Sequence, residues 1–303
     1  MLNLINIGFN PWTEFWKRNQ TITYLFSQKK IINKVLFLHS EVWMGDLLKN
    51  PGDEFARPKL NKWQTIFPKK MAPKITAFTP VHIIFEDRFC VVKKMSSFID
   101  FKVIQQFTKY PFVLILNDPQ ANQEIVDFLL KQARLTIFDW SDDFVEFSNN
   151  QEERKICANT CKKYCESSDI VFTINTKLKK KALAFNDNVH EVRNATNFFT
   201  FQESVNSEGL FPDIKKSGKQ IVGYIGWLNS LRLDLDILEY LIMNRPDIEF
   251  VFMGPKSEEY PLGLKIPFLS NVHLLDPVPY SKYPSCLSAL DVCILPNKIS
   301  PHT

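Results

Sequence analysis

The sequence predicts an α/β protein with two domains, each built on a parallel sheet covered by helices. Short apolar runs alternate with amphipathic stretches along most of the 303 residues, a pattern typical of β–α units. The apolar runs are continuous rather than alternating, as in strands that are buried on both faces of a parallel sheet. A chain of this length usually forms about two domains of roughly 100–200 residues each.

Seven apolar runs predict the strands of the first domain. They lie at residues 5–9, 34–38, 75–78, 112–116, 135–138, 170–174 and 189–192. Stretches with helical spacing fall between them, at residues 15–26, 96–107, 121–131, 151–167 and 176–184. Residues 41–73 interrupt this order with Pro51, Pro58 and Pro68, and we expect irregular structure there.

A polar segment at residues 202–219 contains Gly209, Pro212 and Gly218 and predicts a linker. It separates an N-terminal domain, residues 1–201, from a C-terminal domain, residues 220–303. In the second domain we expect strands at 221–225, 249–253, 272–274 and 292–295, and helices at 235–242 and 283–290. No helix follows the last strand, so we expect an apolar edge or face there that is exposed unless a partner covers it.

The composition favours a cytoplasmic globular protein. Hydrophobic residues make up 45% and charged residues 23%, which argues against disorder. No apolar run approaches the roughly 18 residues of a membrane span, and the start lacks the basic region and cleavage site of a signal peptide. The net charge of +4 is spread along the chain. This distribution argues against a nucleic-acid partner and is compatible with an anionic ligand.

The six cysteines include no C-x-x-C pair, so the spacing of a zinc ribbon is absent. Cys157, Cys161 and Cys165 lie four residues apart and would form one stripe along a helix. Three thiolates could bind a metal, but no fourth ligand is obvious. We therefore expect a small apolar helix face with reduced thiols and no metal site.

Both domains carry an ordered series of motifs. In the second domain these are VGYIGWLNSLRLDLDILEYL, RPDIEFVFMGP and LSNVHLLDPVPYSKYPSCLSALDVCILP, and in the first NPWTEFWKRNQ, IFDWSDDFVEF, DIVFTINTKL and EVRNATNFFTF. The series resembles GT-B glycosyltransferases, especially family 4 enzymes similar to teichuronic acid biosynthesis glycosyltransferases. The resemblance covers nearly the whole chain, and it depends on the order and spacing of the motifs.

The resemblance implies a GT-B fold, with two Rossmann-like domains facing across a cleft. It implies an acceptor side in the first domain, a nucleotide-sugar side in the second, and retaining, metal-independent transfer without a cofactor. The sequence departs from the family pattern at Ala195, Asn197 and Asp276. A donor-site element with two glutamates would begin beyond Thr303, so we expect a C-terminally truncated chain with an incomplete second domain.

By this resemblance, six residues are candidates for donor binding: Gly226, Arg232, Gly254, Val278, Pro279 and Tyr280. Gly226 ends a predicted strand where backbone can approach phosphate, and Arg232 would contact the diphosphate. The turn at 278–280 would bind the base. The alternatives are a solvated arginine at a helix start and a turn shaped only by its prolines.

Three carboxylates follow a predicted strand at the edge of the sheet where ligands usually bind: Asp139, Asp142 and Asp143. They are the candidate catalytic residues, because a carboxylate there can accept the proton of an acceptor hydroxyl or hydrogen-bond a sugar. Helix capping with solvent exposure is the alternative.

The loop after the first strand lines the cleft in the family. Its candidate acceptor-binding residues are Trp12, Glu14, Trp16 and Arg18. The two tryptophans could stack on a sugar or lie against lipid, or instead form a hydrophobic staple for the first helix.

The basic run TKLKKK at residues 176–181 fits peripheral contact with the anionic inner face of a membrane, and a solvated helix face is the alternative. The main hypothesis is a glycosyltransferase that moves a sugar from a nucleotide donor to a cell-envelope or polysaccharide acceptor. A truncated, non-catalytic homologue that acts as a binding or scaffold subunit is the second hypothesis. A nucleotide-sugar epimerase of the same architecture is the third.

Overall fold

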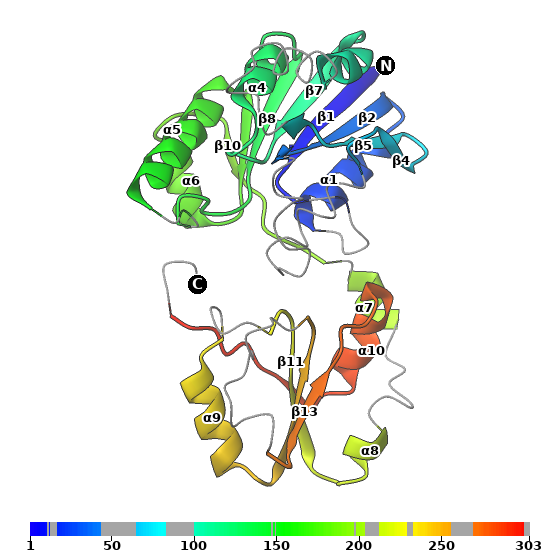
Figure 1. The fold of residues 1–303 in the computed structure, drawn as a ribbon, viewed down its shortest axis with the longest axis vertical. Helices are drawn as coiled ribbons and strands as arrows, with labels where there is room; N and C mark the ends of the chain where they lie inside the picture. Colours follow the sequence, from blue (N-terminus) through cyan, green and yellow to red (C-terminus); the bar gives the residue numbers. More distant parts are fainter. Residues whose placement is uncertain are drawn as a thin grey trace. The chain divides into compact units, whose positions relative to one another are not determined.

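The structure of the chain, a computed structural model, describes residues 1–10, 12, 17–43, 65–82, 100–146, 148, 150–196, 198–203, 212–228, 233–255 and 269–299. The chain divides into two compact units, Met1–Asn194 and Ala195–Thr303, which are described one after the other (Figure 1). The division falls ahead of the segment 202–219 that the sequence predicts as the linker. The reason is that α7 (Phe198–Glu203) and α8 (Pro212–Lys215) pack against elements of the second unit.

An eight-stranded sheet forms the centre of the first unit, in the order β10-β9-β8-β7-β1-β2-β5-β4. Its strands are β1 (Leu2–Gly8), β2 (Ile32–His39), β4 (Lys69–Ala72), β5 (Ile75–Phe78), β7 (Phe112–Leu116), β8 (Leu135–Trp140), β9 (Ile170–Thr173) and β10 (Val189–Glu191). All neighbours are parallel except β4 and β5. The strand order reverses between β1 and β7, the place where open α/β sheets bind ligands.

Helices cover both faces of this sheet (Figure 1). Helix α1 (Arg18–Ser27) packs on one face through Ile22, Tyr24 and Phe26. The other face carries the helical residues 100–108, α4 (Gln123–Leu130), α5 (Gln151–Ser167) and α6 (Thr176–Ala182). An asparagine precedes each of α4, α5 and α6, and its side chain accepts a hydrogen bond from a backbone N–H of the first turn.

The apolar runs predicted this unit well. Strands β5 and β7 and helix α5 have the predicted bounds, and the predicted stripe of Cys157, Cys161 and Cys165 is buried against the sheet. Strand β4 was not predicted, because Lys69 and Lys70 interrupt any apolar run there. An edge strand tolerates such charges. A separate pair, β3 (Val42–Trp43) with β6 (Val81–His82), is also parallel.

The second unit is built on a four-stranded parallel sheet in the order β13-β12-β11-β14. Its strands are β11 (Gln220–Ile225), β12 (Ile248–Met253), β13 (Val272–Leu275) and β14 (Val292–Cys293). Helix α9 (Leu235–Asn244) packs on one face through Leu238 and Ile242, and α8 packs on the other face through Ile214. The short helix η3 (Tyr280–Lys282) leads into α10 (Tyr283–Ser288).

Strand β14 lies at the edge of this sheet as far as the structure describes it. Val292 is 47% exposed and Leu295 is 79% exposed. Two apolar side chains are thus exposed at this edge of the described sheet or just after it. None of the described helices is both long enough and apolar enough to cross a membrane.

Candidate functional site

Polar side chains gather at the carboxyl ends of β1, β7 and β8, on the face of the sheet that α1 covers. Asn6 comes from β1, Asn117 directly follows β7, and Asp139 belongs to β8. All three are almost completely buried. Buried polar groups must be hydrogen-bonded, so this edge of the sheet holds a network rather than an apolar layer.

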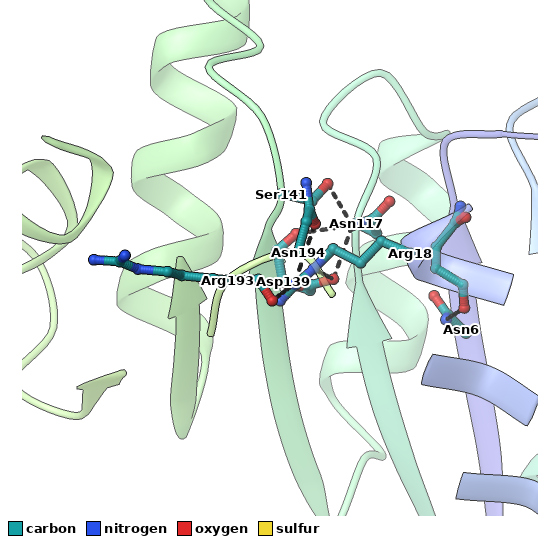
Figure 2. Close-up of polar contacts among 8 residues, drawn as sticks. Asn6, Arg18, Asn117, Asp139, Ser141, Arg193 and Asn194 are labelled. Carbon is teal, nitrogen blue, oxygen red and sulfur yellow. Dashed lines mark hydrogen bonds and ion pairs between the residues drawn. The ribbon is translucent and has the colours of Figure 1, made fainter. Parts of the chain in front are cut away.

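Arg18 and Asp139 form the centre of this network (Figure 2). Arg18 Nε lies 3.1 Å and 3.0 Å from the two carboxylate oxygens of Asp139, and Nη2 donates to Oδ1 at 2.8 Å. Arg18 Nη1 points the other way, 3.3 Å from the carbonyl oxygen of Arg193 and 3.4 Å from Asn194 Oδ1. One guanidinium therefore links the first helix, strand β8 and the segment that follows β10.

Asn117 supports the same carboxylate. Its Nδ2 lies 2.9 Å from the carbonyl oxygen of Asp139, 3.3 Å from Asp139 Oδ2 and 3.0 Å from Ser141 Oγ. On the β1 side of the network, Asn6 Nδ2 donates to Thr23 Oγ1 at 2.6 Å. Two contacts therefore attach α1 to the sheet, one at each end of the polar cluster: Arg18 with Asp139, and Thr23 with Asn6.

Burial raises the pKa of Asp139, and the hydrogen bond and positive charge of Arg18 oppose that rise. Desolvation is the larger of the two effects. The side chain of Asp139 is 2% exposed and both of its oxygens are within hydrogen-bond distance of a donor. The geometry makes Asp139 a group that holds Arg18 and Asn117 in place.

The other two predicted carboxylates lie apart from Asp139. Asp142 is exposed. Asp143 Oδ2 lies 2.8 Å from Lys181 Nζ and 3.5 Å from Lys177 Nζ, so it pairs with the basic helix α6. The three aspartates thus face different surroundings, although they are close in the sequence.

Trp12 is buried, and its ring packs edge-on against Phe37 with centroids 4.9 Å apart. This ring contact is with strand β2 and is not the predicted staple on the first helix, and the burial of Trp12 leaves little of its ring for stacking on a sugar. Glu14 and Trp16, which the sequence also predicts at the acceptor side, lie outside the described residues.

In the second unit, Gly226 and Gly254 meet where β11 and β12 end. A Cβ atom on Gly254, whose φ is +148°, would lie 1.9 Å from the carbonyl oxygen of Gly226. A Cβ atom on Gly226 would lie 2.6 Å from the hydroxyl of Tyr224. Gly254 therefore needs glycine, because its Cβ would meet backbone at a positive φ, whereas a Cβ on Gly226 would require only a shift of the Tyr224 ring.

The predicted base-binding turn follows β13, so it lies at the same edge of the sheet as the two glycines. Tyr280 is 45% exposed, and its ring packs against Phe201 and Tyr283 with centroids 6.2 Å and 5.7 Å apart. Val278 is half-buried and Pro279 is exposed. Arg232 lies outside the described residues.

Sequence reasoning missed three contributors to the first-unit network: Asn117, Asn6, and the pair formed by the Arg193 carbonyl and the Asn194 side chain. Asn117 opens the sequence Asn-Asp-Pro after a buried strand, and this signal could have identified it. Asn6 lies within an apolar run that gives no such signal. No group of three or more metal-ligating side chains occurs among the described residues.

No family model and no curated protein matches this sequence. Solved structures do match its fold. Sucrose-phosphate synthase from Thermosynechococcus elongatus has a TM-score of 0.63 and 14% identity, over 100% of this chain and 77% of that one. The Anabaena protein HepE in complex with UDP has a TM-score of 0.64 and 12% identity, over 100% of this chain and 75% of that one. A structure described as trehalose-6-phosphate from E. coli bound with UDP-2-fluoro glucose has a TM-score of 0.56 and 10% identity. The match covers 97% of this chain and 78% of that one. The chain therefore has the GT-B fold that the sequence predicts.

Proposed function

We propose that this protein is a glycosyltransferase that moves a sugar from a nucleotide-sugar donor to a saccharide acceptor. The observation that carries the proposal is the likeness of the whole chain to GT-B structures, two of which contain UDP or a UDP-sugar. The resemblance of the motifs to family 4 enzymes adds a retaining, metal-independent mechanism and a cell-envelope or polysaccharide acceptor.

We assign the donor to the edge of the second sheet where β11, β12 and β13 end. Gly226 and Gly254 keep side chains away from the ends of β11 and β12, which fits the approach of a diphosphate. Arg232 would neutralise the phosphates, and residues 278–280 would bind the base.

We assign the acceptor to the first unit, beside Glu14, Trp16 and Arg18. Asp142 is our choice for the carboxylate that meets an acceptor hydroxyl, because it is the exposed member of the three aspartates. Asp139 and Asp143 are ion-paired, and in this proposal they position the groups around them.

Peripheral contact with an anionic membrane through α6 stays a prediction. Lys177 and Lys180 are exposed, and the amines of Lys177 and Lys181 lie 3.5 Å and 2.8 Å from the carboxylate of Asp143. Pairing with Asp143 lowers the positive charge that this helix can offer to lipid.

Thermal unfolding with UDP, GDP and ADP tests the donor assignment. A nucleoside diphosphate present at about one hundred times its Kd stabilises the folded state by about 2.7 kcal/mol, which raises Tm by several degrees. Uridine and pyrophosphate are the matched controls, since each carries half of the expected ligand. If no nucleoside diphosphate shifts Tm, the donor assignment is wrong.

A transfer assay then separates the three hypotheses. Incubation with donor and saccharide should give a glycosylated product, which mass spectrometry detects. Nucleotide binding without transfer would favour the non-catalytic homologue. Conversion of the donor sugar without any acceptor would favour the epimerase.

A further inference from the structure

A buried imidazole lies beside the carboxyl end of β1, on the neighbouring strand. His39 ends β2, pairs in register with Gly8 of β1 and is 1% exposed. Among the described residues, its ring nitrogens contact the backbone N–H of Trp12 and the hydroxyls of Thr65 and Thr79. The donor and acceptor roles at His39 follow from the chemistry of these partners.

The backbone nitrogen of Trp12 lies 3.0 Å from His39 Nε2. A backbone N–H can only donate, so Nε2 must be the acceptor and carries no proton. The proton of the neutral ring is then on Nδ1, which lies 2.7 Å from Thr79 Oγ1 and 3.0 Å from Thr65 Oγ1. The two hydroxyls are 2.8 Å apart and accept from this N–H.

The hydrogen bond to His39 Nε2 fixes Trp12, which is the first residue of the stretch from Trp12 to Arg18. Trp12 also packs edge-on against Phe37, and Phe37 packs edge-on against His39 with centroids 5.2 Å apart. Arg18, at the other end of the same stretch, is held by Asp139. Residues 13–16, which include Glu14 and Trp16, lie between these two anchors in the sequence.

We infer that His39 is a positioning residue, which holds Trp12, a predicted acceptor-side residue, through the neutral tautomer protonated on Nδ1. The role in acceptor binding rests on the proposed function. The tautomer and the anchoring of Trp12 do not, because they are properties of the folded chain alone. A protonated ring would present a second donor to the Trp12 N–H and would break the contact.

NMR of the wild-type protein, labelled with ¹⁵N-histidine, tests the tautomer directly. We expect His39 to show an unprotonated Nε2 and a protonated Nδ1. The chain has five histidines, and the spectrum of His39→Gln assigns the signal. A proton on Nε2 would overturn the inference without any variant having to fold.

Variants test the anchoring of Trp12. In His39→Gln, the side-chain carbonyl can accept from the Trp12 N–H, so the Trp12 amide signal should stay near its wild-type position. In His39→Leu, the acceptor is lost and the signal should move. Thr79→Val removes one partner of Nδ1 and leaves Nε2 as the acceptor, so its Trp12 amide signal should also stay near the wild-type position, and a signal that moves would contradict the anchoring through Nε2. His190→Gln, at an exposed histidine of the same unit, is the matched control.

Kinetics test the positioning role. His39→Leu should raise KM for the acceptor roughly tenfold, with the donor KM unchanged and His39→Gln close to wild type. An unchanged acceptor KM in His39→Leu would contradict the role in acceptor binding. Absence of transfer in the wild type, together with the expected tautomer and Trp12 signals, would count against the proposed function and not against the anchoring by His39.

Discussion

Arg18 and Asp139 are 121 residues apart in the sequence, yet Arg18 donates to both carboxylate oxygens of Asp139 inside the first unit. The same guanidinium reaches the backbone of Arg193 and the side chain of Asn194, the last residues of that unit. This pair therefore joins the first helix, the middle of the sheet and the point where the chain leaves the unit.

Breaking this pair should be costly, although the pair itself adds little stability. Arg18→Met or Asp139→Leu alone leaves a buried charge without its partner, and each should lower the free energy of unfolding by about 3–5 kcal/mol. The double variant should recover most of the loss, because desolvation outweighs the attraction, as the raised pKa of Asp139 indicates. Urea unfolding of the two single variants and the double variant measures the coupling.

Lys162→Ala is the control for that cycle. Lys162 and Glu166 form an exposed pair in the same unit, with side chains 51% and 50% exposed, and removing it should have little effect. Additive losses in the Arg18–Asp139 cycle would mean that the two side chains do not stabilise one another.

Gly254→Ala should destabilise the protein more than Gly218→Ala does. Both glycines have positive φ values, +148° and +69°, but a Cβ atom on Gly218 would have no neighbour within 4 Å. Gly218→Ala should therefore cost only the conformational penalty, about 1–2 kcal/mol. Gly254→Ala adds a clash with backbone and should cost more, which urea unfolding can measure. Equal losses would contradict a steric role for the Gly226–Gly254 contact.

Cys293 should react with iodoacetamide in the folded protein, whereas Cys165 should react only after unfolding. Cys293 is exposed, and burial raises the pKa of the Cys165 thiol to about 12, so almost no thiolate is present near neutral pH. Peptide mass spectrometry of a Cys90→Ser background, alkylated with and without urea, measures both sites. Cys293→Ser identifies the fast signal. Labelling of both cysteines at the same rate in the folded protein would contradict the burial of α5.

The fold could be predicted from the sequence because its strands are continuous apolar runs. The apolar runs at 75–78 and 112–116 have the same bounds as β5 and β7. A strand that is buried on both faces is apolar at successive positions, so a short stretch of sequence is enough to recognise it. Strand β4 could not be found in this way, because an edge strand that carries lysines lacks that pattern.

The candidate site was predictable only in part. The sequence identified Arg18 and Asp139 through separate motifs, and it gave no reason to join them. It grouped Asp139, Asp142 and Asp143, whereas the structure pairs the first with α1, exposes the second and pairs the third with α6.

The sequence by itself therefore determined the fold class, the main strands and helices, and the residue types available at the carboxyl edge of each sheet. Only the tertiary structure decided which of these residues meet, and whether a carboxylate or an imidazole is buried, paired or exposed. The physical reason is that hydrophobic periodicity is a local property of the chain. Contacts such as Arg18 with Asp139, or Trp12 with His39, depend on strand order and register, which bring distant segments together.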